Sequence, residues 1–389
     1  MIDRAFLKKF MPSIALALGL VRFRVRMFLM RTPLHDFTFY WAGSRLFLAH
    51  AHPYSVASMA AIERSLGWKD APVGLLYPPW VLPFFAGFGL FPFPLIHSMW
   101  RLAYVAIEAP CVLALWRYFG GSRKRSWIAL AVLFTFLPAG SAEQMGQVTC
   151  LLLAGSTLFL YLVRDQRYGW AGACLLLLCL KPQLVLLVLL AILLWSVRER
   201  HWAVLAAGAA AVAASFGAAF AYNHNVLEYF HSTQPELGYE CGIGGALRSS
   251  FGMQHAWLQF VPTVLGLAWF AVRWTRCRKN WDWSEQMPLL LLASLASAPY
   301  AWADDYVLAL PALVALALRL YQRSEDFVMP AAIYFLLQVA VFSYLPSNAW
   351  ETVASALWLA FYVFFTAQKR SGQQAVEAET RAQLVTVDA

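Results

Sequence analysis

The sequence predicts an all-α polytopic membrane protein. The chain is 61% hydrophobic, and only 13% of its residues are charged, against about 25% in soluble domains. Apolar runs recur from residue 14 to residue 367, and a spanning helix needs roughly 20 apolar residues. We therefore expect about twelve crossings, near 10–30, 97–119, 126–142, 147–163, 168–180, 183–197, 202–222, 256–273, 287–299, 306–322, 327–344 and 350–367.

The division of charge sets the expected topology. Lys and Arg gather in short clusters between apolar runs, and such clusters stay on the cytoplasmic side. That side receives the N-terminus, 123–125, 164–167, 198–200, 273–279, Arg323 and 369–370. The opposite side receives 35–94, 141–147, 181–183, 223–255, 299–305 and 345–351. We expect one integral membrane domain over 1–370 and a polar, disordered cytoplasmic tail over 371–389.

The composition also indicates which kinds of molecule the protein contacts. The net charge of +9 comes from these loop clusters, which contact anionic lipid headgroups and do not form a nucleic-acid footprint. The six cysteines are scattered without metal-ligand spacing, and we interpret them as small apolar fillers.

Two apolar segments are atypical. The run 80–94 is short and carries three prolines, so we interpret it as an interfacial or re-entrant helix rather than a crossing. The first predicted helix carries three arginines in its second half, whose long side chains can reach lipid phosphates at the interface.

A lone carboxylate follows the first apolar run. Asp36 precedes Tyr40, Trp41 and, after Pro53, Tyr54. A partly desolvated carboxylate has a raised pKa and suits a general base, while the aromatic faces suit sugar rings. The alternative is structural, because Asp is also a favoured helix N-cap.

Lys181 interrupts a long apolar stretch. A Lys in contact with hydrocarbon is costly and requires a counter-charge, and Pro182 breaks the helix at this point. The partner is either a lipid phosphate or an acid of the chain, for which Asp304, Asp305 and Glu143 are available.

Further polar motifs occur on the same predicted side. Gly146 and Gln147 begin one crossing; Gln147 is either a buried helix–helix hydrogen bonder or a substrate ligand. Tyr77 precedes two prolines and belongs to a rigid turn or to a binding surface. Gln183 and the segment from Tyr300 through Trp302 to the two aspartates complete the set.

In this order, the motifs resemble glycosyltransferase family 87, which includes polyprenyl-phosphate-mannose-dependent mannosyltransferases. The resemblance extends over roughly 10–365 and is carried by Asp36 with YWAG (40–43), PY (53–54), YPP (77–79), GQ (146–147), KPQ (181–183) and the PY…D pattern of 299–305. It implies a GT-C fold whose long first external loop carries juxtamembrane helices. It also implies a lipid-linked sugar donor, no nucleotide sugar, no metal or other cofactor, and a catalytic Asp just after the first crossing, where Asp36 stands.

From this resemblance we expect an inverting hexosyltransferase, with mannose one candidate sugar, in the bacterial inner membrane with its site facing the periplasm or exterior. Its partners are a polyprenyl-phosphate sugar, a lipid or glycan acceptor and membrane lipids, without nucleic acid. The mannosyltransferase branch tends to carry His near Asp304 and Asp305, and this chain has none there, so the sugar stays open. The alternatives are a transporter or flippase of lipid-linked sugars and a non-catalytic partner in an envelope assembly.

The resemblance and the residue chemistry together predict the roles. Asp36 is the general base; Lys181 is the first choice for the donor phosphate, supported by Arg248 or Arg45. The predicted substrate-binding residues are Tyr40, Trp41, Tyr54, Tyr77, Gln147, Gln183, Tyr300, Trp302, Asp304 and Asp305.

Overall fold

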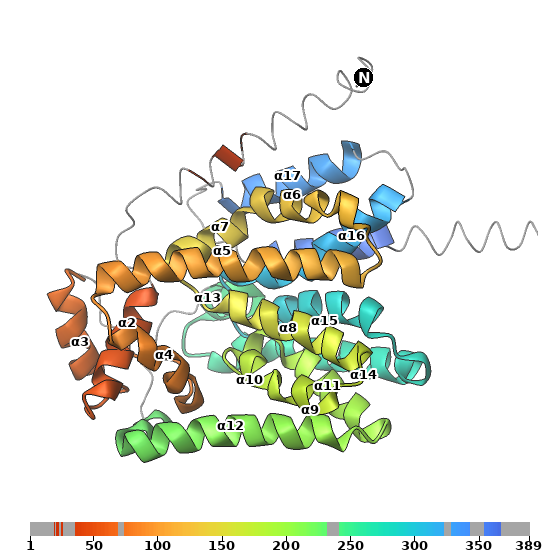
Figure 1. Cartoon of the computed structure of the whole chain (residues 1–389). Coiled ribbons are helices and arrows are strands. Elements are labelled where there is room, and N and C mark those ends of the chain that lie inside the picture. Colours follow the sequence, from red (N-terminus) through yellow and green to blue (C-terminus); the bar gives the residue numbers. More distant parts are fainter. Residues whose placement is uncertain are drawn as a thin grey trace, which may run out of the picture.

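A computed structural model describes residues 36–68, 74–231, 241–322, 328–342 and 354–366, together with Gly19, Val21, Arg22 and Val25. These residues form helices joined by turns and contain no strand, which confirms the predicted all-α class for this part of the chain (Figure 1). The predicted helix at 10–30, the tail at 371–389 and the loop at 345–351 lie outside the described residues, apart from the four isolated positions.

Three short α-helices precede the first long one. They are α2 (Phe37–Leu48), α3 (Val56–Ser65) and α4 (Leu82–Gly89), with the 3₁₀ turn η1 (Pro79–Val81) before α4. Ser55 caps α3 by accepting from the Ser58 amide, while Pro92 follows the end of α4. At 1.5 Å per residue each is far too short for a hydrocarbon core of about 30 Å. Within 80–94, α4 is therefore too short to cross by itself, and its interfacial or re-entrant position stays a prediction.

The remaining helices follow in order. They are α5 (Phe93–Tyr118), η2 (Arg123–Arg125), α6 (Trp127–Thr135), α7 (Leu137–Met145), α8 (Thr149–Arg164), α9 (Tyr168–Ala173), α10 (Leu175–Leu178), η3 (Pro182–Leu184), α11 (Leu186–Arg198), α12 (Trp202–Tyr222), η4 (His224–Phe230), α13 (Gly242–Phe251), η5 (Ala256–Phe260), α14 (Val261–Cys277), η6 (Arg278–Asn280), α15 (Trp283–Ser297), η7 (Ala303–Ala309), α16 (Leu310–Gln322) and α17 (Val328–Phe342). A further helical stretch covers 354–366.

Within the described residues, three helices are long and apolar enough to cross a membrane. They are Phe93–Tyr118, Trp202–Tyr222 and Ala256–Asn280. A fourth candidate is the pair Arg123–Thr135 and Leu137–Met145, which is bent by 60° where Pro138 starts the second helix. Other predicted crossings correspond to shorter apolar helices, including Thr149–Arg164 and Leu186–Arg198. The count of twelve crossings and the GT-C arrangement therefore remain predictions.

The helices have two chemically different ends. In Figure 1, α2, α3 and α4 gather at one end of α5 and α12. The turn η4 at the C-terminal end of α12 contacts η1, so it belongs to the same end. The opposite end of α5 leads into the basic turn Arg123–Arg125. This basic turn thus lies away from the short helices, in the direction that the charge pattern predicts.

Close packing of α9 against α12 gives a direct test of the fold. A Cβ added at Gly172 would lie 2.2 Å from the Val204 carbonyl oxygen, and backbone cannot move aside cheaply. We expect Gly172→Ala to cost about 1–3 kcal/mol of stability through overpacking and to lower the thermal midpoint measured on the detergent-solubilised protein. Gly169, in the same helix, has no atom within 4 Å of its added Cβ, so Gly169→Ala is the matched control. Equal midpoints for the two variants would contradict this packing.

Candidate functional site

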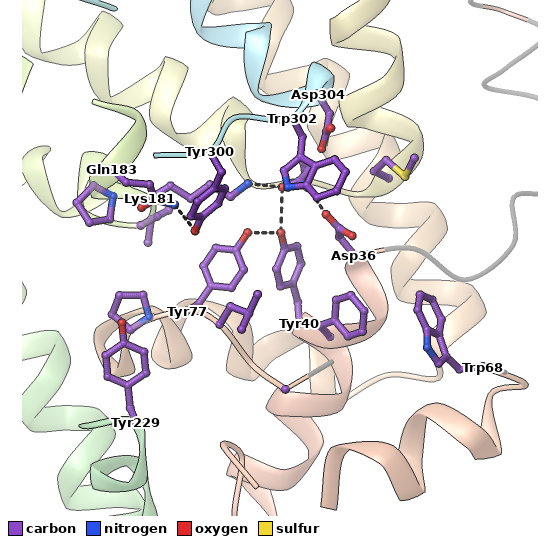
Figure 2. Close-up of a pocket in the computed structure, with 18 residues that line it drawn as sticks. Asp36, Tyr40, Trp68, Tyr77, Lys181, Gln183, Tyr229, Tyr300, Trp302 and Asp304 are labelled. Atoms are coloured by element: carbon purple, nitrogen blue, oxygen red, sulfur yellow. Dashed lines mark hydrogen bonds between the residues drawn. The ribbon is translucent and has the colours of Figure 1, made fainter. Parts of the chain in front are cut away.

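A cavity of about 540 Å³ lies where the short helices meet the ends of the longer ones. Side chains from distant parts of the chain converge on it (Figure 2). It is lined by Asp36, Phe39, Tyr40, Trp68, Gly74, Leu76, Tyr77, Pro78, Met145, Gln147, Leu180, Lys181, Pro182, Gln183, Tyr229, Tyr300, Trp302 and Asp304. Acid, ammonium, amide and aromatic groups therefore share one concave space, which is the usual form of a small-molecule site.

Gln147 is the central hydrogen-bonding group of the cavity. It follows Gly146, which ends α7 in the left-handed region with φ 71°. A Cβ at Gly146 would lie 2.6 Å from the Phe37 Cβ, so glycine is needed there. The Gln147 amide oxygen accepts from Lys181 Nζ at 2.8 Å and from the Tyr40 hydroxyl at 3.1 Å. Its amide nitrogen donates to Asp36 Oδ2.

Asp36 lies immediately before α2 and is partly exposed to the cavity. Its side chain makes no N-cap hydrogen bond, so the carboxylate is directed to Gln147 rather than to its own helix. Burial raises the pKa of Asp36 to about 6, with Lys181 opposing and Asp305 reinforcing the rise. A carboxylate with such a pKa is ionised at neutral pH and is a stronger base than an exposed Asp.

Lys181 stands in the break between α10 and η3, where Pro182 starts the 3₁₀ turn. Its ammonium group is 2.8 Å from Asp305 Oδ1, and it is buried, with Asp305 fully so. Burial alone would lower the pKa of Lys181, but Asp305 and neighbouring groups raise it above its usual value. Lys181 is thus a charged ammonium whose hydrogen bonds to Gln147 and Asp305 occupy two of its three N–H groups.

A pair of tyrosines links the two sides of the cavity. The hydroxyls of Tyr40 and Tyr77 are 2.6 Å apart. Because Tyr40 donates its hydrogen to Gln147, Tyr77 must be the donor to Tyr40. The Tyr77 ring also faces Lys181, whose Nζ lies 5.9 Å from its centroid. These contacts fix the hydroxyls as part of the Gln147 network.

The segment before α16 supplies a third group of residues. Asp305 accepts from the Trp302 backbone N–H at 3.0 Å as well as from Lys181. It is therefore a structural counter-ion, and it is absent from the cavity lining. Asp304 does line the cavity; burial, then Asp305 and Asp36, raise its pKa to about 8. Tyr300 accepts from Gln183 Nε2 at 2.9 Å.

Besides Asp305, four predicted site residues are absent from the cavity lining. The Trp41 indole donates to Phe91 O at 2.9 Å, and Arg45 donates to Gly89 O at 3.2 Å; both side chains tie α2 to the end of α4. Tyr54 donates to Tyr77 O at 2.9 Å and supports the cavity wall from behind. Arg248 donates to Met253 O and to Gln259 within its own segment. None of them lines the cavity, so the predicted phosphate contacts of Arg45 and Arg248 have no support from this geometry.

A known family model matches a large part of the chain. The model of glycosyltransferase family 87 matches residues 75–298, more than half of the chain. The chain belongs to glycosyltransferase family 87. It is therefore a glycosyltransferase with membrane-helix features. Searches of curated proteins and of solved structures gave no significant match.

The matched range of this glycosyltransferase includes part of the cavity. Tyr77, Gln147, Lys181 and Gln183 fall within residues 75–298, whereas Asp36 precedes that range. The structure joins the two parts directly, because Gln147 hydrogen-bonds both Asp36 and Lys181.

Three aromatic residues that line the cavity of this glycosyltransferase, Phe39, Trp68 and Tyr229, were absent from the predicted site. Trp68 follows α3 and Tyr229 belongs to η4. Neither residue stands in a motif or an apolar run. Trp68 could have been identified from its position in a polar loop on the predicted outer side, because loops often carry binding residues.

Proposed function

We propose that this glycosyltransferase moves a hexose from a polyprenyl phosphate to an acceptor hydroxyl at the extracytoplasmic face of a bacterial inner membrane, with inversion. One observation carries the proposal. A single amide, that of Gln147, bonds a carboxylate base through its nitrogen and an ammonium group through its oxygen. A displacement reaction needs such a base and such a cation on opposite sides of the reacting carbon.

The reaction has one covalent step. The acceptor oxygen attacks the anomeric carbon as the bond to the phosphate oxygen breaks, and that bond's electron pair leaves with the polyprenyl phosphate. Asp36 takes the proton of the attacking hydroxyl. General-base assistance of this kind contributes on the order of 10²–10⁴-fold in rate. Attack from the face opposite the phosphate inverts the anomeric configuration.

Lys181 stabilises the leaving phosphate. A phosphate needs charge stabilisation and no proton to leave, and an oriented cation in a water-poor site supplies it. With Gln147 and Asp305 holding two N–H groups, the third is available to a phosphate oxygen. Gln147 also stands between Lys181 and Asp36, which keeps the base from being neutralised by direct pairing.

The location of the cavity supports an extracytoplasmic reaction. It is lined from the segment that contains the short helices and from the break at Lys181, at the end of α5 opposite the basic turn Arg123–Arg125. Basic turns remain cytoplasmic. A lipid-linked donor reaches such a site from the bilayer, without a nucleotide sugar.

A reconstitution experiment tests the function. The purified chain is placed in liposomes with a polyprenyl phosphate that carries a radiolabelled hexose, together with candidate lipid and glycan acceptors. Transfer of the label into a new glycosidic bond supports the proposal. Movement of the labelled lipid across the bilayer without a new bond identifies a flippase instead and refutes the proposal.

The raised pKa values predict a bell-shaped pH profile. Asp36 must be ionised, so the rate rises with pH through about 6. Asp304 becomes ionised near pH 8, which adds a negative charge that repels the anionic donor, so the rate falls above that pH. The profile is measured as kcat/KM for the donor. Asp304→Asn should remove the alkaline limb and keep the acid limb; an unchanged alkaline limb would exclude Asp304 from this role.

A further inference from the structure

The cavity has two chemically distinct arms on either side of the tyrosine pair. In Figure 2, Trp68 and Tyr229 lie on opposite sides of Tyr40 and Tyr77. Gln183 and Tyr300, which are hydrogen-bonded to each other, lie on the side of Tyr229. The Lys181 ammonium is bonded to the same Gln147 amide as Asp36. Asp36 belongs to the arm with Trp68.

The Trp68 arm begins next to the proposed base. Phe39 lies one helical turn after Asp36, to which it is joined by a backbone hydrogen bond of 3.0 Å. The Trp68 ring packs edge-on against Phe39 at 5.3 Å between centroids. All three residues line the cavity, so the aromatic surface of Phe39 and Trp68 and the Asp36 carboxylate face the same space.

The charged groups of the cavity also limit which ligand the Trp68 arm can take. Among the described residues that line the cavity, Lys181 is the only cation, while Asp36 and Asp304 are acids. Figure 2 shows Asp304 near Asp36, on the side away from Gln183. Asp305 balances the charge of Lys181, so the ionised Asp36 makes the Trp68 arm unfavourable for an anion.

We propose that the Trp68 arm is the acceptor subsite and that it takes an uncharged sugar ring, which stacks on Trp68 and directs a hydroxyl to Asp36. This inference rests on the proposed function, because it assigns the donor phosphate to Lys181. The apolar face of a pyranose fits an aromatic surface, and its hydroxyls fit the two carboxyl groups. A phosphorylated headgroup does not fit, since its charge would meet the Asp36 carboxylate, whereas Lys181 is paired with Asp305 and assigned to the donor phosphate.

Binding without donor tests the subsite independently of transfer. The full chain in nanodiscs is titrated with neutral butyl hexopyranosides and with the matched butyl hexuronides and 6-phosphates, and saturation-transfer NMR follows binding. Because no donor is present, no turnover occurs. We expect a neutral glycoside to bind at least about tenfold more tightly than its charged counterparts.

Variants at Trp68 identify the surface that binds. Aromatic pairing is worth up to about 1.5 kcal/mol, so Trp68→Ala should weaken glycoside binding about tenfold, and Trp68→Phe should restore most of it. Trp127, which is exposed and lies outside the cavity lining, is the control: Trp127→Ala should bind as the parent does.

Each outcome decides the inference. Loss of binding in Trp68→Ala with recovery in Trp68→Phe supports the subsite. Equal or tighter binding of the charged glycosides, unchanged affinity in Trp68→Ala, or no glycoside binding at all would overturn it. Trp68-dependent binding combined with an absence of transfer from polyprenyl-phosphate hexoses would refute the proposed function while leaving the sugar subsite standing.

Discussion

Asp36→Asn loses 10²–10⁴-fold in transfer rate, on the order expected when general-base assistance is removed. The substitution keeps the size of the side chain, and its amide can still hydrogen-bond Gln147 after that side chain turns. Binding of the donor and insertion into the membrane should therefore persist. The measurement is the initial rate of label transfer in liposomes, at saturating donor and at a pH near 7, where Asp36 is ionised in the parent protein.

Asp165 provides the matched control for this substitution. It is exposed and pairs with Arg164 in a basic loop, and it does not line the cavity. Asp165→Asn should transfer at the parental rate. Normal transfer by Asp36→Asn would remove Asp36 from the mechanism.

The second large effect concerns Lys181, whose loss affects both folding and catalysis. Lys181→Met leaves the fully buried Asp305 without its ion-pair partner. Removing one member of a buried pair costs about 3–5 kcal/mol, so we expect this variant to lose thermal stability and expression. Measurement of its thermal midpoint in detergent checks this expectation.

A double variant separates the two roles of Lys181. Asp305→Asn removes the stranded charge, and its side-chain oxygen can still accept from the Trp302 N–H that Asp305 binds. Lys181→Met with Asp305→Asn should therefore recover much of the stability. It should still transfer about 10²–10³-fold more slowly, because no cation stabilises the leaving phosphate. Recovery of stability together with activity would mean that Lys181 serves only as a structural partner of Asp305.

The sequence indicated site residues well where a charged side chain interrupts an apolar stretch and is therefore energetically unfavourable without a partner. Lys181 interrupts an apolar stretch, and such a charge must find a partner; the structure gives it Asp305 and Gln147. The sequence left a phosphate and an acid as alternative partners, and the structure shows the acid, Asp305.

Arginine contacts could not be predicted in the same way. Arg45 and Arg248 lie in segments of the predicted outer side, but their long side chains bond nearby carbonyl groups, Gly89 O and Met253 O. Sequence shows that an Arg is near a site and does not show which acceptor its side chain reaches. Trp68 was missed for the opposite reason, because its role depends on the packing of α3 beside α2, which no motif encodes.

The sequence predicted the all-helical class correctly, but it predicted the individual membrane crossings less well. Trp202–Tyr222 coincides with the predicted crossing at 202–222. The predicted crossing at 126–142 is instead two helices bent by 60°, because Pro138 cannot continue the backbone hydrogen bonding of α6. Apolar composition identifies such segments, but their breaks depend on the packing around them.

Labelling from each side of the membrane, with and without donor, tests whether the cavity opens to the extracytoplasmic side and binds the donor. The variants Gln183→Cys in the cavity and Lys124→Cys in the exposed basic turn are treated in oriented membranes with a membrane-impermeant maleimide, against the parent chain with its six native cysteines as background. We expect the thiol of Gln183→Cys to react only from the extracytoplasmic side, and we expect polyprenyl-phosphate hexose to protect it. The thiol of Lys124→Cys should react only from the cytoplasmic side. Labelling of both variants from the same side would contradict an extracytoplasmic position of the cavity.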